Sequence, residues 1–337
     1  MRIVIVGGTG NVGSALVRRL RADPDAVPVV LARRLPRDGG QYGGVEAHRI
    51  DVAGADAVVT LTRLFRGADA VVDLAWALQP NRHPRRMWET NVRGLGHVLR
   101  AVRGAAVPQV VVASSVGAYS LGPKRRRVDE SWPTGGTPSS HYGRFKAEVE
   151  RVLDRFEAAE PGIVVSRVRP GLVLQAAAGA EIRRLFVGRV PLGPVDRLRL
   201  PILPLPRRLV AQVVHADDLA DALARILSRR ASGAFNIAAE PPIGPEEVAG
   251  IFGARAVPIP WRLLRGLTAL GWRTRLSAAD PGWIDLAIDV PLMSTERARR
   301  ELEWEPRIDA RDAVTEVLRA AVRWDGLPES TPLRPGR

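Results

Sequence analysis

Cysteine, long hydrophobic runs and an N-terminal signal peptide are all missing from this sequence. The absence of cysteine excludes disulfides, thiolate metal sites and a cysteine nucleophile. No hydrophobic run approaches the length of a transmembrane helix, and the apolar residues 3–6 are too few for the hydrophobic region of a signal peptide. We therefore expect a cytoplasmic protein without a membrane span.

Lysine is nearly absent, although the chain is strongly basic. Its 50 Lys and Arg residues comprise two lysines, Lys124 and Lys146, and therefore 48 arginines, and the net charge is +14. Such a charge raises the question of a nucleic-acid or anionic-membrane partner. The arginines are spread over every segment, and the densest basic run, at 123–131, lacks the interleaved aromatics of a single-strand binder. We attribute the charge to a chain-wide preference for arginine and expect no nucleic-acid partner.

Short runs rich in valine or isoleucine alternate with helical segments along the first half of the chain. This alternation is typical of a parallel sheet with right-handed crossovers. The predicted strands are 2–6, 27–32, 47–50, 70–75, 109–114 and 162–167, and the clearest helices are about 84–103 and 140–158. The sequence thus predicts an α/β fold, a Rossmann-like doubly wound parallel sheet with a smaller C-terminal substrate-binding lobe.

The alternation lapses after residue 170, and proline is frequent between Pro191 and Pro206. We predict an NAD(P)-binding domain from residues 1–170 plus about 213–238, and a smaller substrate-binding lobe from about 171–212 plus 239–325. The helix after residue 213 returns to the first domain, and Asp217 or Asp218 is expected to cap it. The tail, residues 330–337, is expected to be disordered.

The N-terminal segment combines a buried strand, a glycine-rich turn and an amphipathic helix. Gly7, Gly10 and Gly13 form a G-x-x-G-x-x-G pattern directly after the strand. Glycines at these positions let the chain turn tightly, let the backbone approach a diphosphate, and let helix and strand pack closely. The diphosphate would lie at the helix N-terminus, where unpaired N–H groups and the helix dipole favour an anion. The pattern therefore predicts a dinucleotide-binding turn.

Tyr142 and Lys146 lie four residues apart in a predicted helix, and Ser115 precedes Tyr142 by 27 residues. Residues four apart share one helix face, so the Lys146 ammonium would favour ionisation of the phenol, whose pKa is normally about 10. A hydroxyl from Ser115 could polarise the substrate oxygen that Tyr142 serves. Y-x-x-x-K pairs also arise by chance on exposed helices. In a chain that uses arginine almost everywhere, however, a lysine here indicates a need for a compact cation with a tunable pKa.

With these motifs the sequence resembles the extended short-chain dehydrogenase/reductase family, also called the NAD-dependent epimerase/dehydratase family. Seven further segments follow the family's order, namely those around Asp51, at 71–76, from Thr90, at 110–120, from Arg167, from Val213 and at 301–307. The resemblance implies that Tyr142 is the acid/base, that Lys146 binds the nicotinamide ribose and lowers the tyrosine pKa, and that Ser115 orients the substrate oxygen. It also implies cofactor contacts from Gly7, Gly10, Asn11, Val12, Gly13, Asp51, Val52, Leu74, Ala75, Asn91 and Pro170.

The choice between NAD and NADP depends on the end of the second strand. Arg33, followed by Arg34, occupies the position at which NAD-preferring relatives carry an acid. An acid there binds the ribose 2′-hydroxyl, whereas arginine suits a 2′-phosphate. Arginine is so common in this chain that a chance arginine is the competing explanation. We predict that NADP(H) is preferred, with NAD(H) as the alternative.

Members of the family catalyse several reactions, and we predict an oxidoreductase that reduces a ketone or oxidises an alcohol on a small, fairly apolar molecule resembling a secondary metabolite. The alternative is a sugar or nucleotide-sugar epimerase, in which the same residues oxidise a sugar carbon transiently and return the hydride to its other face. A dehydratase is disfavoured, because the segment after Ser115 lacks the family's Asp-Glu pair. A second alternative, an NADP-sensing regulator, would tolerate loss of the three residues that this chain retains.

Evidence on the substrate comes from the segment after residue 167 and from the tryptophans. The asparagine that nucleotide-sugar relatives carry there is missing, and the stretch 201–212 is largely apolar, although Arg183, Arg184 and Arg189 could meet phosphates. The candidate substrate residues are Trp76, Ser115, Val116 and Gln175, and the candidate pocket walls are Trp261, Trp272 and Trp283. Most lone tryptophans are packing residues, and Trp76 is the best candidate for a role in the pocket.

Three further features complete the interpretation. Segment 261–276 predicts a helix packed on the pocket rather than a basic amphipathic helix on a membrane, because Gly266 and Gly271 weaken it as a free-standing helix. His83, His141 and His215 lack metal-ligand spacing, so no metal is expected. The resemblance implies a homodimer formed through the helices that hold Asn91 and Tyr142.

Overall fold

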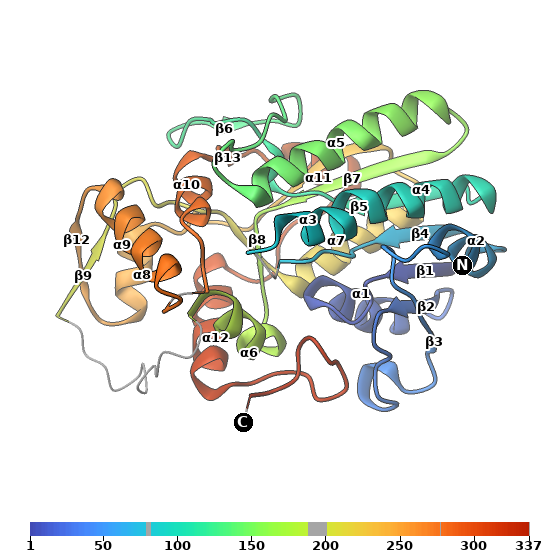
Figure 1. The fold of residues 1–337 in the computed structure, drawn as a ribbon, viewed down its shortest axis with the longest axis horizontal. Coiled ribbons are helices and arrows are strands. Elements are labelled where there is room, and N and C mark those ends of the chain that lie inside the picture. Colours follow the sequence, from blue (N-terminus) through green and yellow to red (C-terminus); the bar gives the residue numbers. More distant parts are fainter. Residues whose placement is uncertain (79–81, 188–200, 277, 337) are drawn as a thin grey trace.

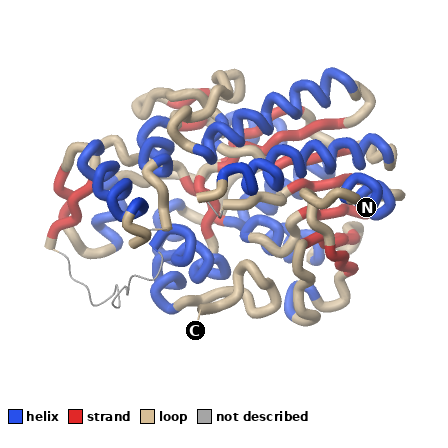
Figure 2. Tube along the Cα trace, in the orientation of Figure 1, coloured by secondary structure: helices blue, strands red, loops and turns tan. Residues whose placement is uncertain are grey.

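The computed structural model describes residues 1–78, 82–187, 201–276 and 278–336, and a seven-stranded parallel sheet forms its centre (Figures 1 and 2). The strand order is β11-β7-β5-β4-β1-β2-β3. The strands are β1 Arg2–Val6, β2 Val27–Ala32, β3 Glu46–Arg49, β4 Ala70–Asp73, β5 Gln109–Ala113, β7 Val164–Pro170 and β11 Gly233–Ile237. The order reverses between β1 and β4, and sheets of this kind bind ligands beside the carboxyl ends of the strands at such a point.

Helices cover both faces of the sheet. One face packs against α1 (Asn11–Arg21) and α7 (Ala216–Arg229), and the other packs against α2 (Ala57–Phe65), α4 (Gly94–Gly104) and α5 (His141–Ala159). Within β1, Ile3 and Ile5 face the first layer whereas Val4 and Val6 face the second. Successive strand residues point to opposite faces, so a strand covered on both sides needs a continuous apolar run.

The remaining elements form shorter units around this core. Three pairs of short parallel strands are β6 Arg127–Val128 with β13 Leu292–Met293, β8 Leu172–Leu174 with β10 Val213–His215, and β9 Ile202–Leu205 with β12 Arg255–Pro258. The other helices are α3 Pro84–Trp88, α6 Gly179–Ile182, α8 Pro245–Ile251, α9 Trp261–Arg273, α10 Gly282–Asp289, α11 Glu296–Leu302 and α12 Ala310–Arg323. Across the four described ranges, no helix is long and apolar enough to cross a membrane.

The predicted fold class is confirmed, and the six predicted strands correspond to β1, β2, β3, β4, β5 and β7. The seventh strand, β11, has the sequence GAFNI and pairs with β7. It begins with glycine and contains an asparagine, so it lacks the valine-rich signal of the other strands. The predicted division into two domains is not tested by these elements and stays a prediction.

The cap predicted for α7 is wrong. Its N-cap is His215, whose Nδ1 accepts a hydrogen bond from the Asp217 N–H at 3.1 Å. The Asp217 carboxylate instead pairs with Arg18. The Asp218 carboxylate accepts hydrogen bonds from the backbone N–H groups of residues 307 and 308. Both acids therefore hold distant segments against α7 rather than capping it.

The C-terminal segment also differs from the disordered tail that its composition predicts. Ser330 and Leu333 are fully buried. The Ser330 hydroxyl donates to the Thr9 carbonyl at 2.6 Å, and the Leu327 N–H donates to the Leu333 carbonyl at 2.8 Å. Residues 330–336 are thus fastened to the glycine-rich turn, whereas residue 337 lies outside the described residues.

Candidate active site

The glycine-rich turn joins β1 to α1 at the carboxyl edge of the sheet. Gly7 has a left-handed φ of 82°. A Cβ on Gly13 would lie 2.3 Å from the Gly7 carbonyl oxygen, and one on Gly7 would lie 2.9 Å from the Ala75 nitrogen. Both positions therefore accept only glycine unless the turn moves. The helix begins at Asn11 with Gly10 as its N-cap, and no side chain caps it, so its first N–H groups suit the diphosphate of a dinucleotide.

Asn11 and Gln175 fasten this turn to the segment after β7. Asn11 Nδ2 donates to the Val173 carbonyl at 2.9 Å, and the Gln175 amide donates to the Asn11 carbonyl at 2.7 Å and to its side-chain oxygen at 2.8 Å. Gln175 is buried, and Val12 packs against the core. The side-chain amide of Gln175, predicted as a substrate residue, is therefore engaged in holding the turn.

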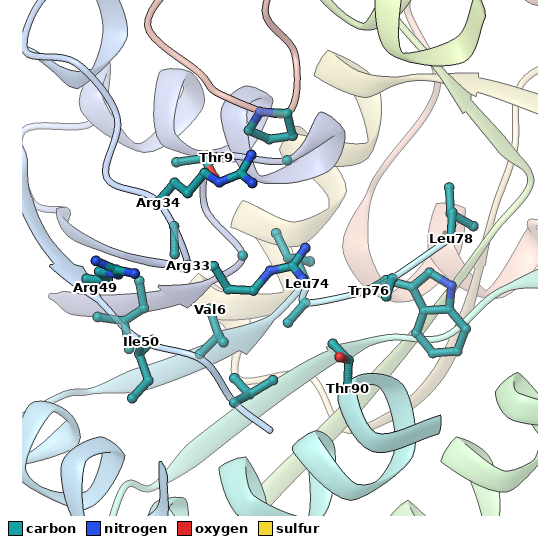
Figure 3. Close-up of a pocket in the computed structure, with 18 of the residues that line it drawn as sticks. Val6, Thr9, Arg33, Arg34, Arg49, Ile50, Leu74, Trp76, Leu78 and Thr90 are labelled. Carbon is teal, nitrogen blue, oxygen red and sulfur yellow. The ribbon is translucent and has the colours of Figure 1, made fainter. Parts of the chain in front are cut away.

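A cavity of about 490 Å³ opens beside the glycine-rich turn (Figure 3). Figure 3 shows Arg49 and Ile50 at one side of it and Trp76 and Leu78 at the other. The predicted cofactor or substrate positions on its lining are Gly7, Gly10, Arg33, Arg34, Val52, Leu74, Ala75 and Trp76. The cavity thus connects the predicted diphosphate turn with the residue expected near the nicotinamide.

Three arginines lie at one side of the cavity, at the ends of β2 and β3. Arg33, Arg34 and Arg49 are exposed and line the cavity, and the register of the sheet places Arg49 beside Ala32. Guanidinium groups bind phosphate through charge-assisted hydrogen bonds. This side of the cavity therefore suits a phosphate group better than an uncharged ribose hydroxyl.

Asp51 and Asn91, which are predicted to contact the cofactor, make hydrogen bonds with backbone groups. Asp51 accepts from the Ala53 N–H at 3.0 Å and is exposed. The buried Asn91 accepts from the Ala77 N–H at 2.7 Å and donates to the Ala77 carbonyl at 2.9 Å. Asn91 therefore fixes the loop after β4, which lines the cavity, while its neighbour Thr90 is on the lining itself.

Ser115, Tyr142 and Lys146 meet at the carboxyl end of β5. The Ser115 hydroxyl accepts from the backbone N–H two residues later at 3.0 Å. Ser140 caps α5, which puts Tyr142 in the first turn and Lys146 one turn later on the same face. The Ser115 side chain lies close enough to the Tyr142 phenol to lower its pKa, and Lys146 Nζ donates to the Ala113 carbonyl at 2.7 Å. Three residues that are far apart in sequence thus form one cluster.

Burial dominates the electrostatics of this cluster. Desolvation raises the pKa of Tyr142 above its ordinary value, and the nearby Ser115 side chain offsets only part of the shift. Desolvation also lowers the pKa of Lys146 to about 7, although the Asp73 and Glu150 carboxylates oppose this shift. The Lys146 nitrogen lies 5.9 Å from the centroid of the Tyr142 ring. The pKa of Tyr142 therefore moves in the direction opposite to the predicted lowering, because burial is the largest cause of its shift.

Two tryptophans enclose the Tyr142 ring. Trp76 meets it edge-on with 5.5 Å between ring centroids, and Trp283 lies at 5.0 Å. The Lys146 nitrogen lies 3.5 Å from the centroid of the Trp76 ring, which is a cation–π contact. Within the described residues, the buried Trp76 Nε1 has no hydrogen-bond acceptor. Trp76 therefore connects the cavity with the cluster.

A buried charge network lies behind the cluster. Glu150, one turn after Lys146 on α5, accepts hydrogen bonds from Arg169 at 2.8 and 2.9 Å, from Arg167 at 3.2 Å and from the Ser114 hydroxyl. Burial alone would raise the pKa of Glu150, but the hydrogen bond with Arg169 holds the pKa below its ordinary value. The network fixes α5 against β5 and β7, and so sets the positions of the two residues that α5 contributes.

Asp73 is a second buried carboxyl near the cluster, at the end of β4. It accepts from the Ala75 N–H at 3.1 Å. Burial raises the pKa of Asp73 to about 6, although that hydrogen bond and the charge of Lys146 oppose the shift. Carboxyl groups with a pKa near neutrality are common at functional sites, because such a group can both donate and accept a proton near neutral pH. Neither composition nor motif spacing had singled out Asp73.

The arginines considered for phosphate binding hold the C-terminal segment in place. Arg183 donates to the Ala321 carbonyl at 3.2 Å and stacks on Trp324 with 4.4 Å to the ring centroid. Arg184 donates to the carbonyls of residues 332 and 334. Arg189 lies outside the described residues. The contacts of Arg183 and Arg184 are thus structural.

Other predicted positions contribute packing. Val116 packs on the small cluster around Tyr119, and Pro170 ends β7. Trp261 and Trp272 belong to α9, which has no buried residue and contributes nothing to the lining of the cavity in Figure 3. The packing of this helix on a substrate pocket stays a prediction. Among the described residues, no three acidic or histidine side chains gather as a metal site.

The residues of the cavity lining that were not predicted include Thr9, Arg49, Thr90, Glu181 and Pro332. Arg49 could have been found, because the carboxyl end of the third strand adjoins that of the second in a sheet of this order. Thr9 lies inside the glycine motif. Glu181 and Pro332 come from segments with no local signal, and burial raises the pKa of Glu181 to about 7.

Comparisons with known proteins agree with this geometry. The sequence model of the NAD dependent epimerase/dehydratase family matches residues 3–238, a region that contains the glycine-rich turn, Ser115, Tyr142 and Lys146. A UDP-glucose 4-epimerase from Streptomyces lividans is 27% identical over 244 residues, which cover 68% of this chain and 72% of the relative. A dTDP-6-deoxy-L-talose 4-dehydrogenase (NAD(P)(+)) from Kitasatospora kifunensis is 30% identical over 174 residues, 50% of this chain and 51% of that protein, so the match spans about half its length.

Among solved structures, a UDP-glucose-4-epimerase from Stenotrophomonas maltophila with bound NAD and formylated UDP-arabinopyranose has a TM-score of 0.70. The sequence identity is 20%, and the match covers 95% of this chain and 98% of the other. At this identity, the likeness establishes a shared fold.

Proposed function

Because this chain belongs to the NAD dependent epimerase/dehydratase family and is an enzyme of the extended short-chain dehydrogenase/reductase type, we propose that it oxidises a secondary alcohol of a nucleotide sugar and reduces the resulting ketone from the opposite face. The net reaction would be epimerisation at that carbon, the activity that the names of several relatives carry. The observation that carries the proposal is the meeting of Tyr142 and Ser115 at the end of β5, with Lys146 one turn away.

The residues divide the proton chemistry between them. A bound nicotinamide dinucleotide would supply the acceptor and donor of hydride. Tyr142 Oη takes the proton of the substrate hydroxyl during oxidation and returns it to the same oxygen during reduction. Ser115 Oγ hydrogen-bonds that oxygen and fixes its distance from the phenol. Lys146 Nζ, when it carries a proton, adds positive charge on the same helix face, which opposes the rise that burial causes in the Tyr142 pKa.

For the cofactor, we propose a preference for NADP(H). The support is the set of exposed arginines at the ends of β2 and β3, at the position where an acid would favour NAD. We also propose that residues 171–212 and 239–325 form the substrate lobe and that α4 and α5 form a two-fold dimer interface. Light scattering during gel filtration tests the dimer, and a monomeric mass would remove that part of the proposal.

A second candidate is a net oxidoreductase acting on a less polar alcohol or ketone. Two observations favour it over the epimerase. Trp76 and Trp283 enclose Tyr142 with apolar surface. The guanidinium groups of Arg183 and Arg184 bind carbonyl groups of the C-terminal segment, and these contacts compete with binding of a substrate diphosphate. A preference for NADP(H) would agree with a cofactor that is released and exchanged in each turnover.

One experiment separates the two candidates. The purified enzyme is incubated with UDP-glucose and catalytic NAD⁺ or NADP⁺, and the 4-epimer is sought by chromatography. In parallel, consumption of NADPH is followed with a series of apolar ketones. Epimer formation without net change in the cofactor supports the proposal, whereas NADPH consumption alone supports the oxidoreductase.

The residue assignment has its own test. Tyr142→Phe should lower kcat by roughly 10²- to 10⁴-fold, the usual contribution of a general acid/base, while leaving cofactor affinity nearly unchanged. Tyr119→Phe is the matched control, because the Tyr119 hydroxyl is bound to Asn236 at 2.7 Å, outside the cavity lining. Full turnover by Tyr142→Phe would remove Tyr142 from the mechanism.

A further inference from the structure

Helix α9 is unusual in having no buried residue. Leu263, Leu267 and Leu270 are 52%, 57% and 60% exposed, and Leu276, just after the helix, is 75% exposed. The spacing of the three helical leucines, four and then three residues, puts them on one face. Single exposed leucines are ordinary in proteins, but a row along one helix face marks a surface for interaction. This leucine row consists of Leu263, Leu267 and Leu270.

The orientation of the row is fixed by contacts on the other side of α9. Arg265 Nε donates to the buried Asp285 of α10 at 2.7 Å. Arg82 donates to the Trp272 carbonyl and stacks on the Trp272 ring with 4.4 Å to its centroid. These contacts hold one face of α9 against the protein and turn the leucine row outward. Figure 1 shows α9 toward the end of the long axis opposite the N-terminal strands.

The charge around the row has one sign. No acidic residue occurs between Glu247 and Asp280, whereas this interval contains five arginines, at 255, 262, 265, 273 and 275. Arg262, Arg273 and Arg275 are exposed on or just after α9, while Arg265 is paired with Asp285. This surface therefore combines positive charge with apolar side chains and has no acidic residue within its own segment.

We propose that the leucine row and the arginines beside it dock on an anionic lipid bilayer. A helix with one apolar face and basic flanks lies in the plane of a membrane interface, with leucines in the acyl boundary and arginines at the lipid phosphates. Charge complementarity selects this occupant. A second copy of the chain on the same face would bring like charges together, which opposes association. The surface would hold the enzyme at a membrane without any spanning segment.

Vesicle sedimentation with the full chain tests the proposal. The protein is mixed with vesicles of phosphatidylcholine alone, or of phosphatidylcholine with phosphatidylglycerol. We expect binding to the mixed vesicles that is weakened by added salt, and little binding to the neutral ones. The triple variant Leu263→Gln, Leu267→Gln, Leu270→Gln should lose at least roughly tenfold in vesicle affinity. All substituted side chains are exposed, and the circular dichroism and Tm of the variant establish that it is folded.

Two further variants make the result specific. Val59→Gln is the matched control, because Val59 is 76% exposed on α2 and should leave vesicle binding unchanged. Arg262→Gln with Arg273→Gln should weaken binding to the anionic vesicles selectively. Equal binding by wild type and the triple leucine variant, or no preference for anionic vesicles, overturns the proposal. Gel filtration in which the leucine variant converts a dimer to a monomer also overturns it, since the face would then bind a second copy.

Discussion

Replacing Gly13 by alanine places a methyl group 2.3 Å from the Gly7 carbonyl oxygen and 2.7 Å from the Gly8 Cα. Non-bonded carbon atoms settle about 3.5 to 4.0 Å from their neighbours, so the turn and the first turn of α1 must separate by about 1 Å. The contacts are backbone atoms on both sides, and no side-chain rotation relieves them. The variant should therefore displace the N–H groups that would receive the diphosphate.

The size of the effect follows from those hydrogen bonds. A hydrogen bond to a charged group contributes about 1.5 to 3 kcal/mol. Loss of the equivalent of one such bond should weaken cofactor binding by roughly 10- to 100-fold. The matched control is Gly96→Ala, since Gly96 also lies within a helix but has no atom within 4 Å of its would-be Cβ. That control should bind the cofactor normally and gain up to about 1 kcal/mol in stability.

Isothermal titration with NADPH and NADH gives the affinities, and thermal denaturation with and without cofactor gives the stabilities. Wild-type affinity in Gly13→Ala would falsify the view that the close approach of helix and turn forms the diphosphate site. A lower Tm with unchanged affinity would contradict it in the same way, because the substitution would then affect packing alone.

Four other substitutions probe the remaining features. Lys146 has a pKa of about 7 in the folded protein and an ordinary value of 10.5. Burial of the charged lysine therefore lowers the free energy of unfolding by its full amount below about pH 7, and by progressively less as the pH rises to about 10. Lys146→Met should therefore raise the Tm relative to wild type more at about pH 6 than at about pH 9, and a difference of the opposite sign contradicts the assigned shift. Glu150→Gln leaves buried Arg169 without its counter-ion and should destabilise the protein by about 3 to 5 kcal/mol in urea unfolding, whereas a loss below about 1 kcal/mol would mean that the network is not desolvated. Arg33→Ala should weaken NADPH binding by roughly tenfold or more while leaving NADH nearly unaffected, and equal losses for both cofactors would remove the phosphate argument. Leu333→Ala should destabilise by about 2 to 5 kcal/mol and expose the C-terminal segment to limited proteolysis, and continued resistance would show that the segment is not anchored there.

The sheet and the cluster were predictable because their signals are local. β1 contains an apolar run that is followed at once by the glycine pattern. The strand ends at Val6 and the turn begins at Gly7, as the sequence predicts. The spacing of Tyr142 and Lys146 is a property of one helix, and a helix preserves it. Ser115 follows a valine-rich strand whose place in the sheet is set by the alternating pattern.

What the sequence did not reveal depends on contacts between distant segments. The pKa of Lys146 is set by burial and by two carboxylates, and Asp73 has no motif to identify it. Trp283 reaches Tyr142 from α10, 141 positions further along the chain. The role of Gln175 likewise depends on its meeting Asn11, so a residue that reads as part of a substrate segment becomes a brace for the glycine-rich turn.

The bond between the Ser330 hydroxyl and the Thr9 carbonyl closes a loop of 321 residues, and Pro332 on the same segment helps to wall the cavity. Contacts of such long sequence separation form late in folding, because the entropy of closing the loop must be overcome before they add stability. The wall of the cavity is therefore completed only after both ends of this span have come together. Cofactor affinity in this protein should consequently develop as one of the last events of folding, well after the sheet itself is formed.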